Sequence, residues 1–327
     1  MQSELRAKLL EAFSEANGEF ISGQKISEYI GCSRTAVWKH IESLRKDGYE
    51  LEGVRKLGYR ITKKPDKISS NEIQLGLKTE YMGRNIFFEE IVDSTQKIAQ
   101  NLAADGTPEG TIVVADMQSN GRGRMSRKWY SPSGTGIWMS MVIRPNIPVI
   151  DTPQLTLLTA VAVTQAIEEI TPLHPNIKWP NDILLNNKKI VGILTELQAE
   201  ADQVHAVIIG IGINVNQRTE DFPEELQSIA TSLHRETGNT IERAKLIQAI
   251  LLKFEQLYTL YISKGFLPIK LLWESYSISL KNELIARTLT GTIQGKAIGI
   301  DDNGVLLLED NDKKIHRIYS ADIELLE

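Results

Sequence analysis

At 327 residues, of which 42% are hydrophobic and 24% charged, the chain has an ordinary globular composition and room for two or three domains. A net charge of −5 at pH 7 excludes a uniformly basic protein that coats nucleic acid, and a single cysteine excludes an intramolecular disulfide. No apolar run reaches the ~18 residues of a membrane span, no signal peptide is evident and ligands for structural zinc are scarce, so we expect a cytoplasmic protein.

The first 65 residues have the pattern of a winged helix-turn-helix domain. Apolar residues recur at helical spacing from Leu5 to Phe13 and Gly18 follows them, while Ser22 is placed to cap a second helix that ends at Ile30. The inner face of this second helix is expected to carry Ile26, Tyr29 and Ile30.

A third helix is expected to begin after a tight turn at Gly31, with Ser33 as its cap, and to end at Gly48. Its early, outward residues would meet base edges, and strands at 49–52 and 58–62 would flank a basic wing. The predicted DNA-binding residues are Ser33, Arg34, Thr35, Lys39, Arg55 and Lys56. Residues 1–65 hold 12 Lys and Arg against 9 Asp and Glu, which is weak support for DNA binding, and a protein-docking module is the alternative.

Residues 66–74 are polar and predict a linker into a larger domain over 75–275. There, a strand-like run over 86–92 leads to Asp93-Ser94-Thr95, at the start of a helix over 96–105. Hydroxyl groups at such a junction either bind a polar ligand head beside the free helix N–H groups or serve only as the helix cap.

Between predicted buried strands at 110–115 and 137–143 lies the stretch Met117–Trp138, which we call the arginine loop. It holds three arginines, one lysine and four glycines. Glycines let backbone amides approach a ligand closely, and guanidinium groups match carboxylate and phosphate in shape and charge. A ligand-binding loop is therefore expected, with a solvated basic loop as the alternative.

An apolar helix over 152–170 is followed by the segments IKWPND (177–182), KKIVGILTEL (188–197) and VHAVIIGIGINVN (204–216). The last two predict a strand hairpin whose glycines mark either close approach of a ligand or another backbone, or bulges. Residues 219–270 are expected to be helical, and short alternating strands in a domain over 276–327 predict a small β-barrel. We find no functional chemistry in that last sequence. The expected fold is multidomain α+β, with a mixed central sheet.

These parts fit the activation of a carboxylic acid by a nucleotide. A carboxylate and an α-phosphate repel each other, so cations must hold them together: here the arginine loop with Lys178 and Lys189, and Mg²⁺ on Asn181 and Asp182. The sequence contains neither a G-x-x-x-x-G-K-[ST] phosphate loop nor a nucleophile elbow.

The motifs GRGRMSRKW, KWPND, KIVGILTE and GIGINVN, in this order behind a winged helix, resemble the bifunctional biotin–protein ligases and biotin operon repressors of bacteria. The similarity covers essentially the whole chain. It implies a central ligase domain, an SH3-like C-terminal barrel and two half-reactions. Biotin and ATP, with Mg²⁺, give biotinyl-5′-AMP and pyrophosphate, and a lysine of a biotin carboxyl carrier protein then takes the biotin.

The resemblance also assigns residues. For biotin it implies Ser94, Thr95, Gln96, Gln118, Arg122, Gly123, Arg124, Lys189, Gly192 and Leu194. For ATP it implies Arg122, Arg127, Trp129, Lys178 and Asn214, for Mg²⁺ Asn181 and Asp182, and for catalysis Lys189 and Arg124. Gln96 stands where the family commonly has asparagine, and Met125-Ser126 replaces a more basic pair that contains glycine, which puts loop closure in question.

The resemblance further implies that biotinyl-AMP acts as corepressor. It would order the arginine loop, pair two ligase domains edge to edge as a homodimer and offer two recognition helices to a palindromic operator, with the carrier protein competing for the same edge. Two alternatives are a lipoate–protein ligase on a related fold and a non-catalytic, biotin-responsive DNA-binding regulator.

Overall fold

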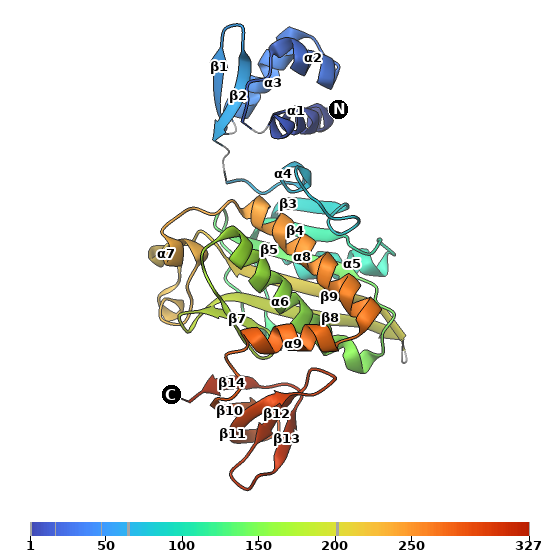
Figure 1. The fold of residues 1–327 in the computed structure, drawn as a ribbon, viewed down its shortest axis with the longest axis vertical. Helices are drawn as coiled ribbons and strands as arrows, with labels where there is room; N and C mark the ends of the chain where they lie inside the picture. Colours follow the sequence, from blue (N-terminus) through green and yellow to red (C-terminus); the bar gives the residue numbers. More distant parts are fainter. Residues whose placement is uncertain (1, 17, 47, 64–65, 201–202, 327) are drawn as a thin grey trace. The chain divides into compact units, whose positions relative to one another are not determined.

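The computed structural model describes residues 2–16, 18–46, 48–63, 66–200 and 203–326. The chain divides into two compact units, residues 1–78 and 79–327 (Figure 1). Residues 65 and 327, the last ones of two predicted domains, lie outside the described residues. Within the described part of the chain, no helix combines the length and the apolar character that crossing a bilayer requires.

The first unit has the predicted helices and hairpin. Its elements are α1 (Gln2–Glu15), α2 (Gly23–Ile30), α3 (Arg34–Lys46), β1 (Glu50–Val54), β2 (Gly58–Lys63) and α4 (Ser70–Gln74). Strands β1 and β2 pair antiparallel. Leu9, Ile26 and Ile41, one from each of the first three helices, are fully buried together, so the three helices share one core.

Two expectations for this unit are corrected. Tyr29 was expected on the inner face of α2, but it is 44% exposed, because only Ile26 and Ile30 of α2 reach the core. The segment predicted as a plain linker contains α4, which begins after Ser69, whose hydroxyl accepts a hydrogen bond from Glu72 N. Short polar helices of this kind lack the apolar periodicity by which longer helices are found.

The second unit is built on a seven-stranded mixed sheet of order β3-β4-β5-β9-β8-β7-β6. Its strands are β3 (Ile86–Val92), β4 (Ile112–Gln118), β5 (Gly136–Ile143), β6 (Asn176–Lys178), β7 (Asp182–Leu185), β8 (Lys188–Glu200) and β9 (Gln203–Asn214). Strands β3 and β4 are parallel and the other pairs antiparallel. The mixed sheet that we expected is confirmed.

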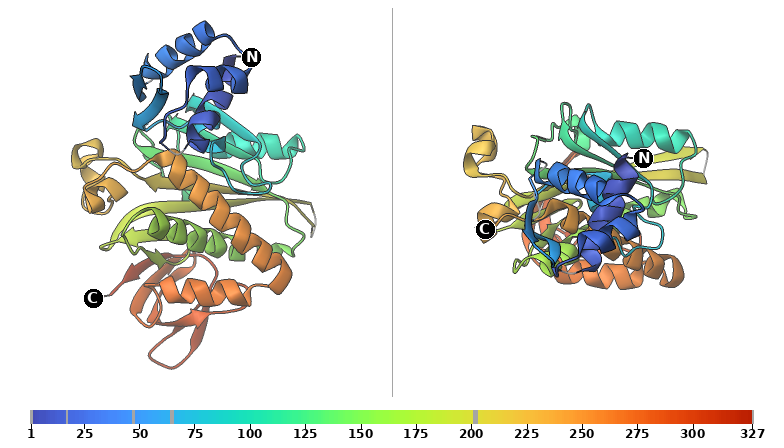
Figure 2. Two further views of the ribbon diagram at one scale, coloured as in Figure 1. Left: turned by 45° about the horizontal axis from the view of Figure 1, so that its top comes forward. Right: turned by 90° about the horizontal axis from the view of Figure 1, so that it is seen from above.

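Helices cover both faces of this sheet. On one face, α5 (Thr95–Ala104) packs Ala99 and Ala103 against Val113, Val142 and Ile208. On the other lie α6 (Thr152–Ile170) and α8 (Arg243–Lys264), which pack on each other (Figure 1). The view from above separates α5 from α8 by the thickness of the strands (Figure 2).

The segment predicted to be helical over 219–270 is only partly so. It begins with the 3₁₀ turns Thr219–Asp221 and Glu224–Leu226 and the short helix α7 (Leu233–Thr237), before α8 and α9 (Leu267–Tyr276). Here Pro223 and Gly238 interrupt the helical pattern.

The C-terminal domain, predicted as a small β-barrel, is confirmed to be rich in β-strands. It forms a five-stranded antiparallel sheet of order β13-β12-β11-β10-β14, and no pairing between the edge strands β13 and β14 is found among the described residues. Its strands are β10 (Glu283–Thr288), β11 (Gly291–Ile300), β12 (Leu306–Glu309), β13 (Ile315–Ile318) and β14 (Asp322–Leu325).

Candidate active site

A cavity of about 540 Å³ opens over the α5 face of the large sheet. Every residue predicted for biotin, ATP or Mg²⁺ lines it. These residues are Ser94, Thr95, Gln96, Gln118, Arg122, Gly123, Arg124, Arg127, Trp129, Lys178, Asn181, Asp182, Lys189, Gly192, Leu194 and Asn214. Side chains from β3–α5, the arginine loop, β6–β7, β8 and β9 are thus brought to one place, while their individual roles stay predictions.

Glycines form part of the floor of the cavity because side chains lie directly on the sheet there. A Cβ atom on Gly212 would come 2.5 Å from Trp129 Nε1, and one on Gly192 would come 2.8 Å from the same ring. A Cβ on Gly210 would come 2.6 Å from Gln96 Oε1. The sequence predicted close approach of a ligand or another backbone at these glycines, or bulges, whereas the groups that approach them here are side chains, an indole ring and an amide.

The inner end of the cavity is polar and internally hydrogen bonded. Thr95 N and Gln118 Oε1 lie 2.9 Å apart, and Thr95 Oγ1 lies 2.9 Å from Ser140 Oγ. Ser140 donates to Gln96 Oε1 at 3.0 Å, while Gln96 Nε2 donates to the Ile208 carbonyl at 3.1 Å. The longer glutamine side chain thus reaches the backbone of β9 and is fixed there, which suits a group that orients a polar ligand head.

Of the two alternatives for the hydroxyl groups at this junction, the helix cap does not apply to the Ser94 hydroxyl. Ser94 is the N-cap residue, but its side chain makes no capping hydrogen bond and is 1% exposed, at the wall of the cavity. The N–H of Thr95 is satisfied by Gln118 of β4 instead. The hydroxyl of Ser94 is therefore not committed to the helix N-terminus.

The opposite end of the cavity is charged. Lys189 Nζ lies 2.6 Å from Asp182 Oδ1 and 5.3 Å from the centroid of the Trp129 ring. Lys178 faces Asp182 across the β6–β7 hairpin. Burial lowers the pKa of Lys178, the charge of Asp182 raises it and that of Lys189 lowers it. Two ammonium groups around one carboxylate leave a net positive site.

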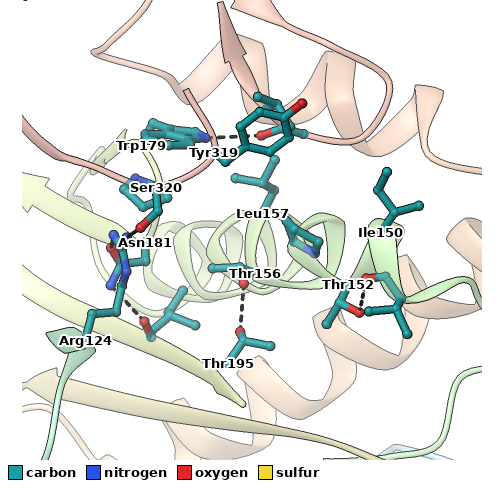
Figure 3. Close-up of a pocket in the computed structure, with 16 residues that line it drawn as sticks. Arg124, Ile150, Thr152, Thr156, Leu157, Trp179, Asn181, Thr195, Tyr319 and Ser320 are labelled. Carbon is teal, nitrogen blue, oxygen red and sulfur yellow. Dashed lines mark hydrogen bonds between the residues drawn. The ribbon is translucent and has the colours of Figure 1, made fainter. Parts of the chain in front are cut away.

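Two guanidinium groups of the arginine loop lie at this charged end, and both contact the C-terminal domain. Arg124 donates to Asn181 Oδ1 at 3.1 Å and to Ser320 Oγ at 2.6 Å (Figure 3). Arg127 makes a two-point ion pair with Asp322, with Nη1 3.0 Å from Oδ1. Two residues of the C-terminal domain, in whose sequence we found no functional chemistry, therefore contact the arginines that line the cavity.

Sequence reasoning missed several residues that line the cavity or contact its arginines. Ser140 lies in an apolar run, and nothing in the sequence marks it except the glycines of the strand beside it, β9. Ser320 and Asp322 lie far along the chain from the loop that they contact. The segment that follows β9 contributes a further wall, because Lys189 N donates to the Ile229 carbonyl and Thr231 N donates to the Lys189 carbonyl.

The predicted DNA-binding residues lie on the first unit. Ser33, Arg34, Thr35 and Lys39 are exposed at the start of α3, and Arg55 and Lys56 are exposed in the β1–β2 turn. The Ser33 hydroxyl accepts from Ala36 N at 3.2 Å, so it caps the helix as expected. Trp38, which was not predicted, is 53% exposed on α3 and adds an aromatic group to the same helix.

Comparison with known proteins gives one consistent result. Family models match as "HTH domain" over residues 6–60, "Biotin/lipoate A/B protein ligase family" over 88–214 and "Biotin protein ligase C terminal domain" over 284–326. The bifunctional ligase/repressor BirA of Bacillus subtilis is 62% identical over 325 residues, covering 99% of this chain and all of that one. That of Escherichia coli is 29% identical over 90% of this chain and 89% of its own length. The biotin protein ligase of Aquifex aeolicus, solved with biotin and ATP, matches with 34% identity and a TM-score of 0.64 over 74% of this chain and 99% of that one.

Proposed function

The chain belongs to the family of bifunctional biotin ligase/repressors, and from this premise we propose that it attaches biotin to a carrier protein and controls DNA binding with the same ligand. The observation that carries the proposal is the single cavity in which a hydroxyl- and amide-lined end meets a cluster of lysines and arginines. Biotin has a polar ureido head and an anionic tail, and these two ends match the two ends of the cavity.

In the first half-reaction, an oxygen of the biotin carboxylate attacks the α-phosphorus of ATP. The bond from that phosphorus to the bridging oxygen breaks and pyrophosphate leaves. We assign to Lys189 the contact with both the carboxylate and the α-phosphate, and to Arg124 the neutralisation of charge beside it. Such fixed cations act most strongly where charge develops in the transition state.

The cavity fits a magnesium ion that arrives with the nucleotide. Among the residues described, no group of three His, Cys, Asp or Glu could hold a metal unaided. The amide of Asn181 already accepts from Arg124 and donates to the Ile193 carbonyl, so the carboxylate of Asp182, which pairs with Lys189, is the group that would hold the ion. Mg²⁺ is usually held by one or two carboxylates together with substrate phosphates. It would neutralise the departing pyrophosphate.

In the second half-reaction, a neutral lysine amine of the acceptor attacks the acyl carbon of biotinyl-5′-AMP. The bond from that carbon to the phosphate oxygen breaks, AMP leaves and the amine loses a proton. The proposed acceptor is a biotin carboxyl carrier protein. Trp129, whose ring is packed on Gly192 and Gly212 at the floor of the cavity, would lie against the adenine.

We expect pyrophosphate release that depends on both biotin and MgATP, and transfer of labelled biotin, but not labelled lipoate, to carrier protein. Release of pyrophosphate without transfer of biotin would limit the assigned activity to adenylate formation. Transfer of lipoate alone would favour the other branch of the biotin/lipoate ligases, and the absence of both would leave a regulator without catalysis.

The first unit is proposed to bind operator DNA. Arg34→Ala should weaken operator binding by roughly ten- to a hundredfold, because loss of one arginine contact to a base edge costs about 1–3 kcal/mol. Pyrophosphate release should not change, since Arg34 belongs to the other compact unit. Electrophoretic mobility shift with biotin and MgATP measures the first quantity.

Arg287→Ala, which removes the same charge from the exposed C-terminal pair with Glu324, is the matched control. Equal weakening by both substitutions would show a non-specific charge effect, and reduced ligation by Arg34→Ala would show that the two activities are not separable as proposed.

The proposed repressor acts as a homodimer. We place the dimer interface at β8 because of the pairing of this strand. Strand β7 pairs only with residues 188–192 of β8. Among the described strands, none pairs with residues 194–200 of β8 on the side away from β9. A free strand edge invites pairing with a second copy or with another protein.

A further inference from the structure

We propose that Ser320, between β13 and β14, and Asp322, the first residue of β14, are positioning residues for adenylate formation, acting through Arg124 and Arg127. This inference rests on the proposed ligase function. It assigns to the end of the chain the task of fixing where two guanidinium groups of the arginine loop lie before any substrate arrives.

The charge balance of the cavity gives the first argument. Asp322 lines the cavity that is proposed to receive the triphosphate of ATP, where an unpaired carboxylate would repel the ligand. Its two-point pairing with Arg127 cancels that charge and also fixes the plane of the guanidinium group. The hydrogen bond and the charge of Asp322 together raise the pKa of Arg127.

The second argument is that the charge of Arg124 requires hydrogen-bond acceptors. Burial lowers the pKa of its guanidinium group, which marks it as the more desolvated of the two. A buried charge is stable only when its donors are satisfied. Asn181, in the turn between β6 and β7, and Ser320, between β13 and β14, provide acceptors on two sides (Figure 3). The side chain is therefore held between two parts of the second unit.

The backbone between these two arginines is strained. Met125 and Ser126 have φ angles of 55° and 58°, in the left-handed region that a residue with a Cβ rarely adopts because of steric crowding. Such a turn persists only when its surroundings hold it. Gly123 N donates to the Arg127 carbonyl at 2.8 Å, and the contacts of the two arginines fix the turn from outside. Without the contacts of the two arginines, we expect the loop to relax into a less strained conformation.

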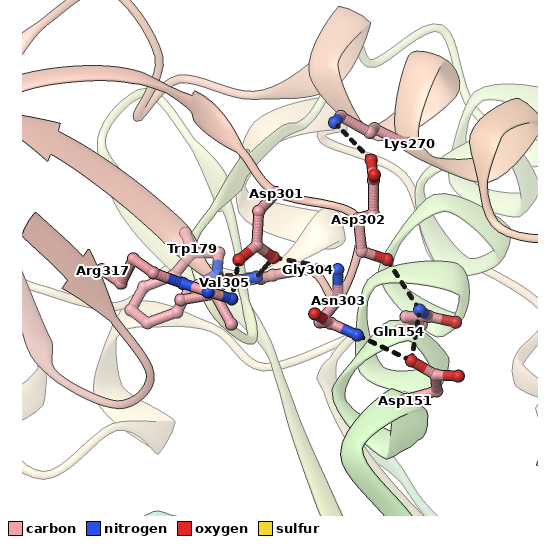
Figure 4. A network of polar contacts seen from close by, with 10 residues as sticks. All are labelled: Asp151, Gln154, Trp179, Lys270, Asp301, Asp302, Asn303, Gly304, Val305 and Arg317. Carbon is pink, nitrogen blue, oxygen red and sulfur yellow. Dashed lines mark hydrogen bonds and ion pairs between the residues drawn. The ribbon is translucent and has the colours of Figure 1, made fainter. Parts of the chain in front are cut away.

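The C-terminal sheet is itself fastened to the ligase part, so its residues have defined positions. The turn between β11 and β12 carries most of this attachment (Figure 4). Trp179 Nε1 donates to the Gly304 carbonyl at 3.2 Å, and Gln154 Nε2 donates to the Asp302 carbonyl at 2.8 Å. Asn303 Nδ2 donates to Asp151 Oδ1 at 2.9 Å. Trp179 is two residues from Asn181, so this attachment lies beside the charged end of the cavity.

Asp322→Asn in the full-length protein tests the inference by biotin-dependent exchange of pyrophosphate with ATP. We expect kcat to fall roughly tenfold, because small displacements of a catalytic cation are costly in rate. KM for MgATP should not rise, because Arg127 loses its partner and its charge becomes available to phosphates. A folding defect would instead lower the fraction of active protein and the melting temperature, without the combination of a lower kcat and a KM that does not rise.

A double-mutant cycle shows whether Asp322 acts through Arg127. Arg127→Gln removes the guanidinium group, and Asp322→Asn should then have no further effect on kcat. Asp322→Glu should restore most of the rate, and Ser320→Ala should lower kcat several-fold through Arg124. Glu309→Gln, which breaks an ion pair with Lys313 elsewhere in the C-terminal sheet, is the matched control and should behave as wild type.

Unchanged kcat in Asp322→Asn, or losses that add in the double variant, would overturn the inference. Both outcomes require a wild-type protein with biotin-dependent exchange. A wild-type protein without exchange would instead overturn the proposed function itself, so the two failures are distinguishable.

Discussion

Replacing Lys189 with alanine should reduce biotinyl-adenylate formation by at least about a hundredfold, the range in which removal of a preorganised charge-stabilising group falls. Lys189 is the ammonium group closest to Asp182 and lies against the Trp129 ring at the cavity floor. In the proposed reaction, its loss leaves two anions to approach each other without the cation that bridges them. Biotin-dependent pyrophosphate release measures the effect.

The fold should survive this substitution. Lys189 is about one-third exposed, and partly exposed ion pairs contribute on the order of 0–1 kcal/mol to stability. Lys188→Ala is the matched control, because Lys188 is next in sequence but does not line the cavity and donates to the Gln227 carbonyl instead. Wild-type turnover in Lys189→Ala would remove the catalytic assignment, and equal loss in Lys188→Ala would indicate a general disturbance of β8.

Leu197→Lys should weaken ligand-driven dimerisation by at least roughly tenfold while adenylate formation continues. Leu197 is 36% exposed in the unpaired stretch of β8 and does not line the cavity. Lysine is a common means by which sheet edges avoid pairing, because its charge must be desolvated when a second strand is added. Sedimentation of the protein alone, with biotin, and with biotin plus MgATP measures the association.

Ile298→Lys provides the comparison, since Ile298 is an equally apolar strand residue with 43% exposure in the C-terminal sheet. Dimers of normal strength in Leu197→Lys would place the interface elsewhere. Weakening by both substitutions would reflect the added charge alone.

Most of the long helices and strands, and the predicted site residues that meet in the cavity, could be predicted from the sequence because that information is local. Strand and helix periods are readable over ten residues, and the motifs around Arg124, Lys178, Lys189 and Gly212 each lie within one short segment. The family resemblance predicted that these motifs contribute to one site. The order of the strands in the sheet explains how they come to line one cavity. The glycines on the floor were recognisable because glycine within a strand has few structural explanations.

What could not be predicted depends on contacts between distant segments. Asp322 and Arg127 meet only because the C-terminal sheet is fastened to the ligase part, and no local pattern encodes that docking. Ser140 reads as one polar residue in a buried strand until Gln96 is found above it. Tyr29 was misplaced because a helical period fixes the direction of an apolar face to within about one residue, and the neighbouring helices decide what is covered.

Strand β8 holds Lys189 and Leu194 at the cavity and continues without a break into its free edge at 194–200. The part of the cavity floor that is predicted to bind biotin and the proposed dimer edge therefore meet within one residue of β8. Under the proposed function, an inhibitor designed to sit on that floor would not merely stop biotin attachment. If the bound inhibitor ordered the strand as the adenylate does, the protein would bind the operator even without sufficient biotin. The cell would then make less biotin, so one compound would lower the biotinylation of the carboxylases in two ways.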